Sequence, residues 1–212
     1  MQHFSPKQVE RKHGQESQTG ERWPSALLAG KTVGILGVGL IAEYLAPICK
    51  TFHMTVIGIS GSPRETKGFD RVVHRDDLVK IAPELDFLVV LTPLTPETRG
   101  IIGEKLLSAM KPTSYLVNVA RGGVVDEPAL IAALEARKIA GAGLDVFSQE
   151  PLPPDNPLWK TKNVTIFSHL GGYSQGYEDR AMPTIAGNMA KFLAGDHKSM
   201  INIVRKPASW GV

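Results

Sequence analysis

The sequence has 212 residues, of which 42% are hydrophobic, and a formal net charge of +3. This composition is typical of a globular chain with a substantial core, and the scattered lysines and arginines do not favour nucleic-acid binding. Cys49 is the single cysteine, the first residues are polar, and no apolar stretch is long enough to cross a bilayer. We therefore expect no disulfide framework, no metal cluster, no membrane anchor and a cytoplasmic setting.

Strands and helices are predicted to alternate from Lys31 onward. Apolar runs predict seven strands, at 31–36, 55–59, 72–73, 86–91, 115–119, 141–144 and 164–167. Helices are expected between them, notably at 126–137, with a final helix at 175–194 and a short one at 6–15. Because the strands are continuously apolar and helices separate them, we predict an α/β fold with a doubly wound parallel sheet. The expected parts are a polar segment 1–24, a dinucleotide-binding domain 25–173, and a C-terminal helix and tail 174–212.

The turn after the first predicted strand has the spacing of a dinucleotide-binding loop. Gly37 permits a tight turn, Gly39 lets the backbone approach phosphates, and Ala42 keeps helix and strand close. The helix that opens with Leu40 and Ile41 then offers N–H groups and the positive end of its dipole to an anion. Taken alone, the same pattern also suits a plain turn between two buried elements.

Four further motifs follow in order: Leu91–Thr98, Asn118–Gly123, Gly143–Pro151 and Ser168–Gly172. Together with the glycine turn, they resemble those of the D-isomer-specific 2-hydroxyacid dehydrogenases. The resemblance implies a Rossmann-type domain that binds NAD(P)H. It also implies an oxidoreductase that transfers a hydride between this cofactor and a small 2-oxo or 2-hydroxy acid such as glyoxylate or hydroxypyruvate.

Three side chains in these motifs are candidates for catalysis. Arg121 follows the fifth strand, and its planar guanidinium can hold a carboxylate through two contacts. His169 follows the seventh strand, where a histidine can exchange protons near neutral pH. Glu150 lies in the preceding proline-rich loop, which can fold it back to favour a protonated imidazole. The resemblance makes these positions the catalytic arginine, histidine and glutamate; taken alone, each could be an ordinary surface, core or loop residue.

The resemblance also implies a set of residues beside the cofactor. Asp145 would face the nicotinamide carboxamide, and the loop around Thr92 would lie beside the ribose and phosphates. The predicted set is Gly37, Gly39, Leu40, Ile41, Ser60, Ser62, Arg64, Thr92, Pro93, Thr98, Val119, Ala120, Asp145 and Gly171. As alternatives, Asp145 could cap the next turn, and the prolines and threonines could form an ordinary rigid turn.

The second strand lacks the acidic residue that normally ends it and binds the ribose 2′-hydroxyl of NAD. No acid occurs after this strand until Glu65. Ser60 and Ser62 can instead donate hydrogen bonds to a 2′-phosphate, and Arg64 can pair with it. We predict that NADP(H) binds at least as well as NAD(H), with an ordinary polar turn of no preference as the alternative.

The sequence departs from the resembled family before Lys31. That family builds its substrate domain mainly from residues that precede the cofactor domain, to which the C-terminal helix would return. We therefore expect a complete cofactor half and a mostly absent substrate half, which would give cofactor binding with weak or absent turnover. We also expect a homodimer formed through apolar residues of the last helix, such as Met182, Ile185 and Met189. A non-catalytic dinucleotide-binding or interaction module is the alternative function; another Rossmann enzyme would not explain the three catalytic candidates together.

Overall fold

The computed structural model describes residues 26–203 and divides the chain into two compact units. The first unit ends at His169 and the second begins at Leu170, shortly before the boundary expected after residue 173. The predicted polar segment 1–24 and the predicted helix at 6–15 lie outside the described residues.

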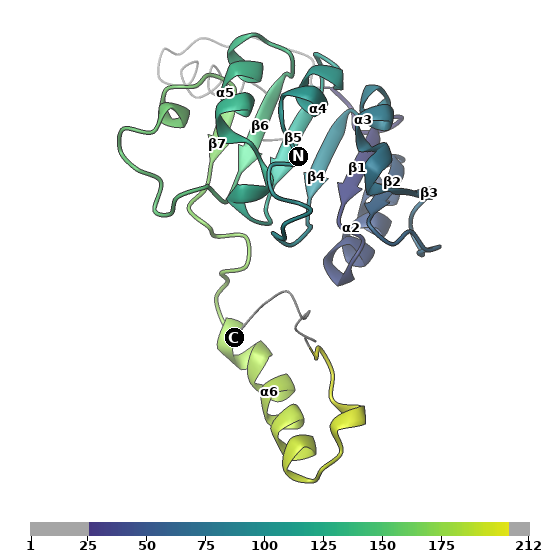
Figure 1. Ribbon diagram of the computed structural model, residues 1–212. Helices are drawn as coiled ribbons and strands as arrows, with labels where there is room; N and C mark the ends of the chain where they lie inside the picture. The colour runs from purple at the N-terminus through teal and green to yellow at the C-terminus, as the bar shows by residue number, and fades with distance from the viewer. Residues whose placement is uncertain (1–25, 204–212) are drawn as a thin grey trace, which may run out of the picture. The chain divides into compact units, whose positions relative to one another are not determined.

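A seven-stranded parallel sheet forms the centre of the first unit (Figure 1). The strands are β1 Thr32–Leu36, β2 Thr55–Ser60, β3 Arg71–His74, β4 Phe87–Val90, β5 Tyr115–Asn118, β6 Gly141–Leu144 and β7 Val164–Ile166. Their order is β3-β2-β1-β4-β5-β6-β7, so the direction of winding reverses between β1 and β4. All pairings are parallel, and the prediction of a doubly wound parallel sheet is confirmed. Sheets of this kind bind ligands beyond the carboxyl ends of the strands, at the reversal.

Helices cover both faces of the sheet, and most residues of the strands between the two edges are therefore buried. In the described part of the first unit, the α-helices are α2 Leu40–Thr51, α3 Leu78–Ile81, α4 Glu104–Ala109 and α5 Glu127–Glu135. Helix α2 packs Ala42, Ala46 and Cys49 against one face, whereas α3, α4 and α5 contribute to the core on the other (Figure 1). Burial raises the pKa of the Cys49 thiol, in keeping with a packing role. None of the helices within residues 26–203 is long and apolar enough to span a membrane.

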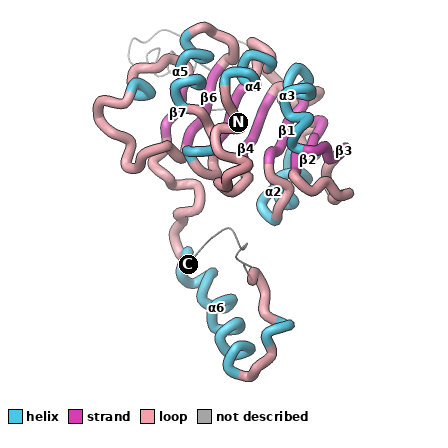
Figure 2. Tube along the Cα trace, in the orientation of Figure 1, coloured by secondary structure: helices cyan, strands magenta, loops and turns pink. Residues whose placement is uncertain are grey.

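The described part of the second unit contains helix α6, Tyr177–Leu193, and a short 3₁₀ turn at His197–Ser199 (Figure 2). The helix predicted at 175–194 is therefore confirmed, with slightly shorter ends. Asn188 ties the tail back to this helix, because its amide donates to the Ile201 carbonyl at 2.8 Å and accepts the Ile201 N–H at 3.0 Å.

Candidate active site

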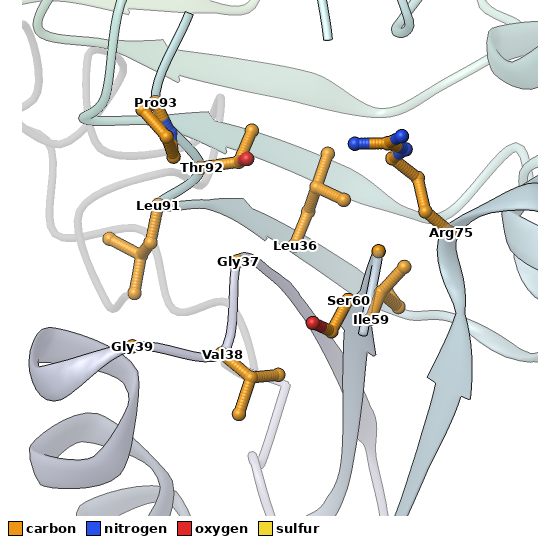
Figure 3. Close-up of a pocket in the computed structure, with 11 residues that line it drawn as sticks. Leu36, Gly37, Val38, Gly39, Ile59, Ser60, Arg75, Leu91, Thr92 and Pro93 are labelled. Atoms are coloured by element: carbon orange, nitrogen blue, oxygen red, sulfur yellow. The ribbon is translucent and has the colours of Figure 1, made fainter. Parts of the chain in front are cut away.

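A first cavity lies at the reversal of the sheet, beyond the ends of β1, β2 and β4 (Figure 3). Its volume is about 240 Å³, and it is lined by Leu36, Gly37, Val38, Gly39, Ile59, Ser60, Gly61, Arg75, Leu91, Thr92 and Pro93. Five residues of the predicted cofactor set are among them: Gly37, Gly39, Ser60, Thr92 and Pro93. Arg75 also lines this cavity, although sequence analysis did not single it out.

The two glycines of the turn shape the cavity for different reasons. Gly37 has a φ of +103°, and a Cβ there would lie only 2.5 Å from the Thr92 backbone nitrogen. Gly39 precedes α2, and a Cβ there would meet nothing within 4 Å. No side chain in the described part of the protein caps this helix. The turn therefore leaves room for phosphates at the positive end of the α2 dipole.

In the polar segment at the end of β2, Ser60 lines the first cavity, whereas Arg64 does not. Ser60 ends the strand and its Oγ accepts the Ser62 N–H at 3.1 Å. The Arg64 guanidinium pairs with Glu43 of α2 at 2.6 Å and does not line the cavity. The binding roles predicted for these residues remain predictions.

Thr98 organises the loop that follows β4. Its hydroxyl is buried, donates to the Pro93 carbonyl at 2.7 Å and accepts the Thr95 N–H at 2.8 Å. These bonds tie Pro93 and Thr95 to Thr98, and Pro93 lines the cavity together with Thr92. A direct contact between Thr98 and a cofactor remains a prediction.

The remaining predicted cofactor residues lie at several places. Leu40 and Ile41 are exposed on the first turn of α2, Val119 is exposed after β5, and Ala120 is buried beside it. Gly171 belongs to the second unit. Their contacts with a cofactor also remain predictions.

A second cavity, of about 650 Å³, contains all three catalytic candidates. Arg121 reaches it from the loop after β5, Glu150 from the loop after β6, and His169 from the segment after β7. Parallel strands end at one edge of the sheet, so residues just beyond them can meet. The structure confirms that the three residues converge on one cavity; their catalytic roles remain predictions.

Glu150 and His169 form a closely bonded pair. Glu150 Oε2 lies 2.6 Å from His169 Nδ1, and Glu150 Oε1 accepts the Phe147 N–H at 2.9 Å. Burial alone would raise the pKa of Glu150, but these hydrogen bonds and the charges of His169 and Arg121 outweigh it and lower the pKa below the ordinary 4.5. The carboxylate therefore stays ionised and orients the imidazole, so that Nε2 is the ring atom for proton exchange with a bound molecule.

Two residues that sequence analysis did not single out fix the Arg121 loop. Buried Asn118 accepts the Ala120 N–H and donates to the Arg121 carbonyl, both at 3.1 Å. A Cβ on Gly122 would lie 1.8 Å from the Phe147 carbonyl carbon, so this loop packs directly on the backbone that follows β6. A polar residue at the end of an apolar strand was the one available signal for Asn118.

Asp145 connects the ends of three strands. Its N–H donates to the Asn118 carbonyl and its carbonyl accepts the His169 N–H, both at 2.9 Å. The residue is 5% exposed. These bonds fix the backbone of His169 relative to β5 and β6, and the predicted contact of the Asp145 side chain with nicotinamide stays a prediction.

A doubly wound sheet with a phosphate-binding turn at its reversal, beside an arginine, glutamate and histidine cluster, defines a dinucleotide-binding domain. The family model described as "D-isomer specific 2-hydroxyacid dehydrogenase, NAD binding domain" matches residues 2–171. The chain belongs to the D-isomer specific 2-hydroxyacid dehydrogenase family.

Curated relatives in this family are longer than the present chain. A glyoxylate reductase of Korarchaeum cryptofilum is 42% identical over 167 residues, which are 79% of this chain and 50% of that protein. A D-3-phosphoglycerate dehydrogenase of Methanocaldococcus jannaschii is 37% identical over 188 residues, which are 88% of this chain and 35% of that protein. The chain thus spans about half the length, or less, of these two relatives.

Solved structures show the same architecture. A D-isomer specific 2-hydroxyacid dehydrogenase from Xanthobacter autotrophicus, in complex with NADPH and MES, gives a TM-score of 0.83 at 33% identity and covers 95% of this chain and 81% of that one. An NADPH-dependent glyoxylate/hydroxypyruvate reductase from Sinorhizobium meliloti gives 0.80 at 27% identity and covers 89% of this chain and 60% of that one.

Proposed function

We propose that this chain provides the cofactor-binding and proton-exchanging part of an NAD(P)-dependent 2-hydroxyacid oxidoreductase. The observation that carries the proposal is the 2.6 Å pair of Glu150 and His169, in one cavity with Arg121. The relatives named for glyoxylate and hydroxypyruvate reduction support a small 2-oxo acid as substrate.

The residues of the first cavity fit a nicotinamide dinucleotide. The Gly37–Gly39 turn and the amino end of α2 would receive the pyrophosphate, and Ser60 would lie beside the adenosine ribose. Asp145, which follows β6, would contact the carboxamide of the nicotinamide ring. When bound, this cofactor would supply the hydride for reduction of a ketone.

The second cavity would act on the acid itself. Arg121 would hold the substrate carboxylate through two parallel N–H contacts and polarise the keto oxygen. His169 Nε2 would donate a proton to that oxygen during reduction and take it back during oxidation. Glu150 would keep the ring oriented through its contact with Nδ1, which leaves Nε2 for the substrate.

A preference for NADP(H) over NAD(H) forms part of the proposal. In β2, Ser60 occupies the end of the strand, where a carboxylate would repel a 2′-phosphate and a hydroxyl can donate to it. The solved relatives in complex with NADPH and NADP support this reading.

We also propose that the chain forms a homodimer through the apolar side of α6. Met182, Ile185 and Met189 are 54%, 54% and 56% exposed, and their spacing puts them on one side of the helix. Light scattering after gel filtration should give a dimer mass for the wild type and a monomer mass for Ile185→Glu. A wild type that is monomeric at every concentration would overturn this part.

Cofactor titration combined with a turnover assay tests the central proposal. We expect the protein to bind NADPH saturably and to reduce at least one of glyoxylate, hydroxypyruvate and pyruvate. The loss of reduction in His169→Asn, with NADPH binding retained, would support the role of the histidine. Binding without reduction of any of the three acids would support a non-catalytic dinucleotide-binding module instead, and absence of binding would overturn both functions.

A further inference from the structure

The positive charge in the first cavity, where the cofactor is proposed to bind, comes from the turn that follows β3. Among the described residues that line the cavity, Arg75 is the charged one. Figure 3 shows its side chain approaching from one side of the cavity, with Thr92 and Pro93 on the other. Arg64 follows β2 more closely in sequence, but its charge is paired with Glu43 at 2.6 Å.

The pairing of β2 with β3 explains the position of Arg75. Ser60, the last residue of β2, pairs with His74, the last residue of β3. Arg75 therefore extends beyond β3 beside Gly61, and a Cβ on Gly61 would lie 3.4 Å from Arg75 Nη1. The guanidinium thus lies against the backbone just past the end of the second strand, which is where such folds contact the 2′-position of the adenosine ribose.

The neighbourhood holds this arrangement in place. His74 Nε2 lies 3.0 Å from the Gly61 carbonyl, which ties the turn after β2 to the end of β3. The charge of Arg75 also acts on Glu97, whose carboxylate accepts the Thr95 hydroxyl at 2.6 Å. That hydrogen bond, with a smaller contribution from the Arg75 charge, lowers the pKa of Glu97. Glu97 is exposed, so solvent screens it and leaves the cation available to an anion in the cavity.

We propose that Arg75, rather than Arg64, is the residue that recognises the 2′-phosphate and makes the protein favour NADP(H). The inference rests on the proposed function, because it concerns the cofactor of the same site. A guanidinium can bind two phosphate oxygens at once, and the Ser60 hydroxyl adds a donor from β2. NAD(H) carries a neutral hydroxyl at this position, so it gains little from the Arg75 charge.

Isothermal titration with two nucleotide pairs tests this assignment on the full chain. NADP⁺ is compared with NAD⁺, and 2′,5′-ADP with 5′-AMP, because each pair differs by the 2′-phosphate alone. Arg75→Met should weaken NADP⁺ and 2′,5′-ADP by about tenfold or more, since it removes a charged hydrogen-bonding partner. NAD⁺ and 5′-AMP should change by less than about twofold, and Arg75→Lys should retain part of the preference.

Two other arginines complete the design. Arg71→Met removes the same charge from β3 but breaks only an ion pair with Glu84, so it should leave the preference intact. Arg64→Met tests the competing residue, and this variant should also keep the preference for NADP⁺ over NAD⁺. The assignment would be overturned if Arg64→Met abolished the preference, or if Arg75→Met weakened 5′-AMP as much as 2′,5′-ADP, which would indicate stacking on the base. Failure of the wild type to bind either cofactor would instead refute the proposed function.

Discussion

The two cavities at the carboxyl edge of the sheet differ in which atoms determine their chemistry: mainly backbone in the first and mainly side chains in the second. Backbone shapes the first: one glycine fits the close approach of Thr92, another leaves open space, and one cation lies at the side. Side chains shape the second, where Glu150 bonds His169 and the loops behind them are in direct backbone contact. We therefore expect substitutions in the first cavity to change nucleotide affinity by filling space or removing charge. In the second cavity, we expect them to change the reaction rate or the stability by breaking contacts between neighbouring residues.

We expect the largest effect from His169→Asn, which should slow the reaction without weakening cofactor binding. His169→Asn keeps an amide near Glu150 but removes Nε2, so reduction of the preferred 2-oxo acid should slow by about 10²–10⁴-fold. The Kd for NADPH should stay within about twofold of the wild type, because His169 does not line the cofactor cavity. Single-turnover kinetics with protein in excess measures the rate, and fluorescence titration measures the Kd. An equal loss in both quantities would show that the cavities are not separable in this way.

The next effect concerns the stability of the catalytic side. Gly122→Ala should lower the free energy of unfolding by about 3 kcal/mol, because the new methyl group would overlap the Phe147 backbone. Urea unfolding followed by circular dichroism measures the change. Gly39→Ala provides a matched control, since its methyl group meets open space and should cost less than about 1 kcal/mol. Similar costs for the two variants would contradict the contrast between the cavities.

Gly39→Ala should weaken the binding of NADPH, although it should have little effect on stability. The added Cβ would occupy the space through which the pyrophosphate approaches the turn, so the affinity for NADPH should fall by about tenfold. Titration of NADPH onto a variant whose unfolding curve matches the wild type measures this effect. An unchanged Kd would mean that the phosphates do not approach the backbone at Gly39.

The smallest effect tests the electrostatics of the catalytic pair. The folded-state pKa of Glu150 is lowered, so its ionised form contributes stability above the ordinary 4.5, and that stability is lost as the pH falls through the lowered value. Because the side chain is 34% exposed, we expect Glu150→Gln to cost only about 0.5 kcal/mol at pH 7 and less at pH 3. Unfolding free energies of both proteins across this pH range provide the measurement. A cost that does not depend on pH would assign the effect to packing rather than charge.

Local patterns in the sequence were enough to predict the sheet and the convergence of the catalytic candidates. Most of the strands are apolar runs, and Arg121, Glu150 and His169 lie beyond strand ends, where parallel pairing brings them together. Arg75 could not be found in this way, because its place beside Gly61 depends on the register between β2 and β3. Proximity along the chain favoured Arg64 instead, but no local pattern showed its pairing with Glu43.

The role of Asn118 in fixing the Arg121 loop could not be predicted from the sequence for a related reason. Its two hydrogen bonds run to backbone atoms whose positions are set by the turn after β5, and a side-chain pattern does not report such positions. The same holds for Gly122, whose close contact lies with a loop about 25 positions away along the chain.

The contact between Gly122 and the backbone of Phe147 also matters to anyone who wishes to change the substrate range by directed evolution. A library that randomises only the loop after β5 would meet a fixed backbone opposite, and most of its members would be lost to poor expression. Both loops have to be sampled together. In gene shuffling among relatives, crossovers between residues 122 and 147 would join loops from different parents, whereas crossovers before β5 would inherit the fitted pair from one parent.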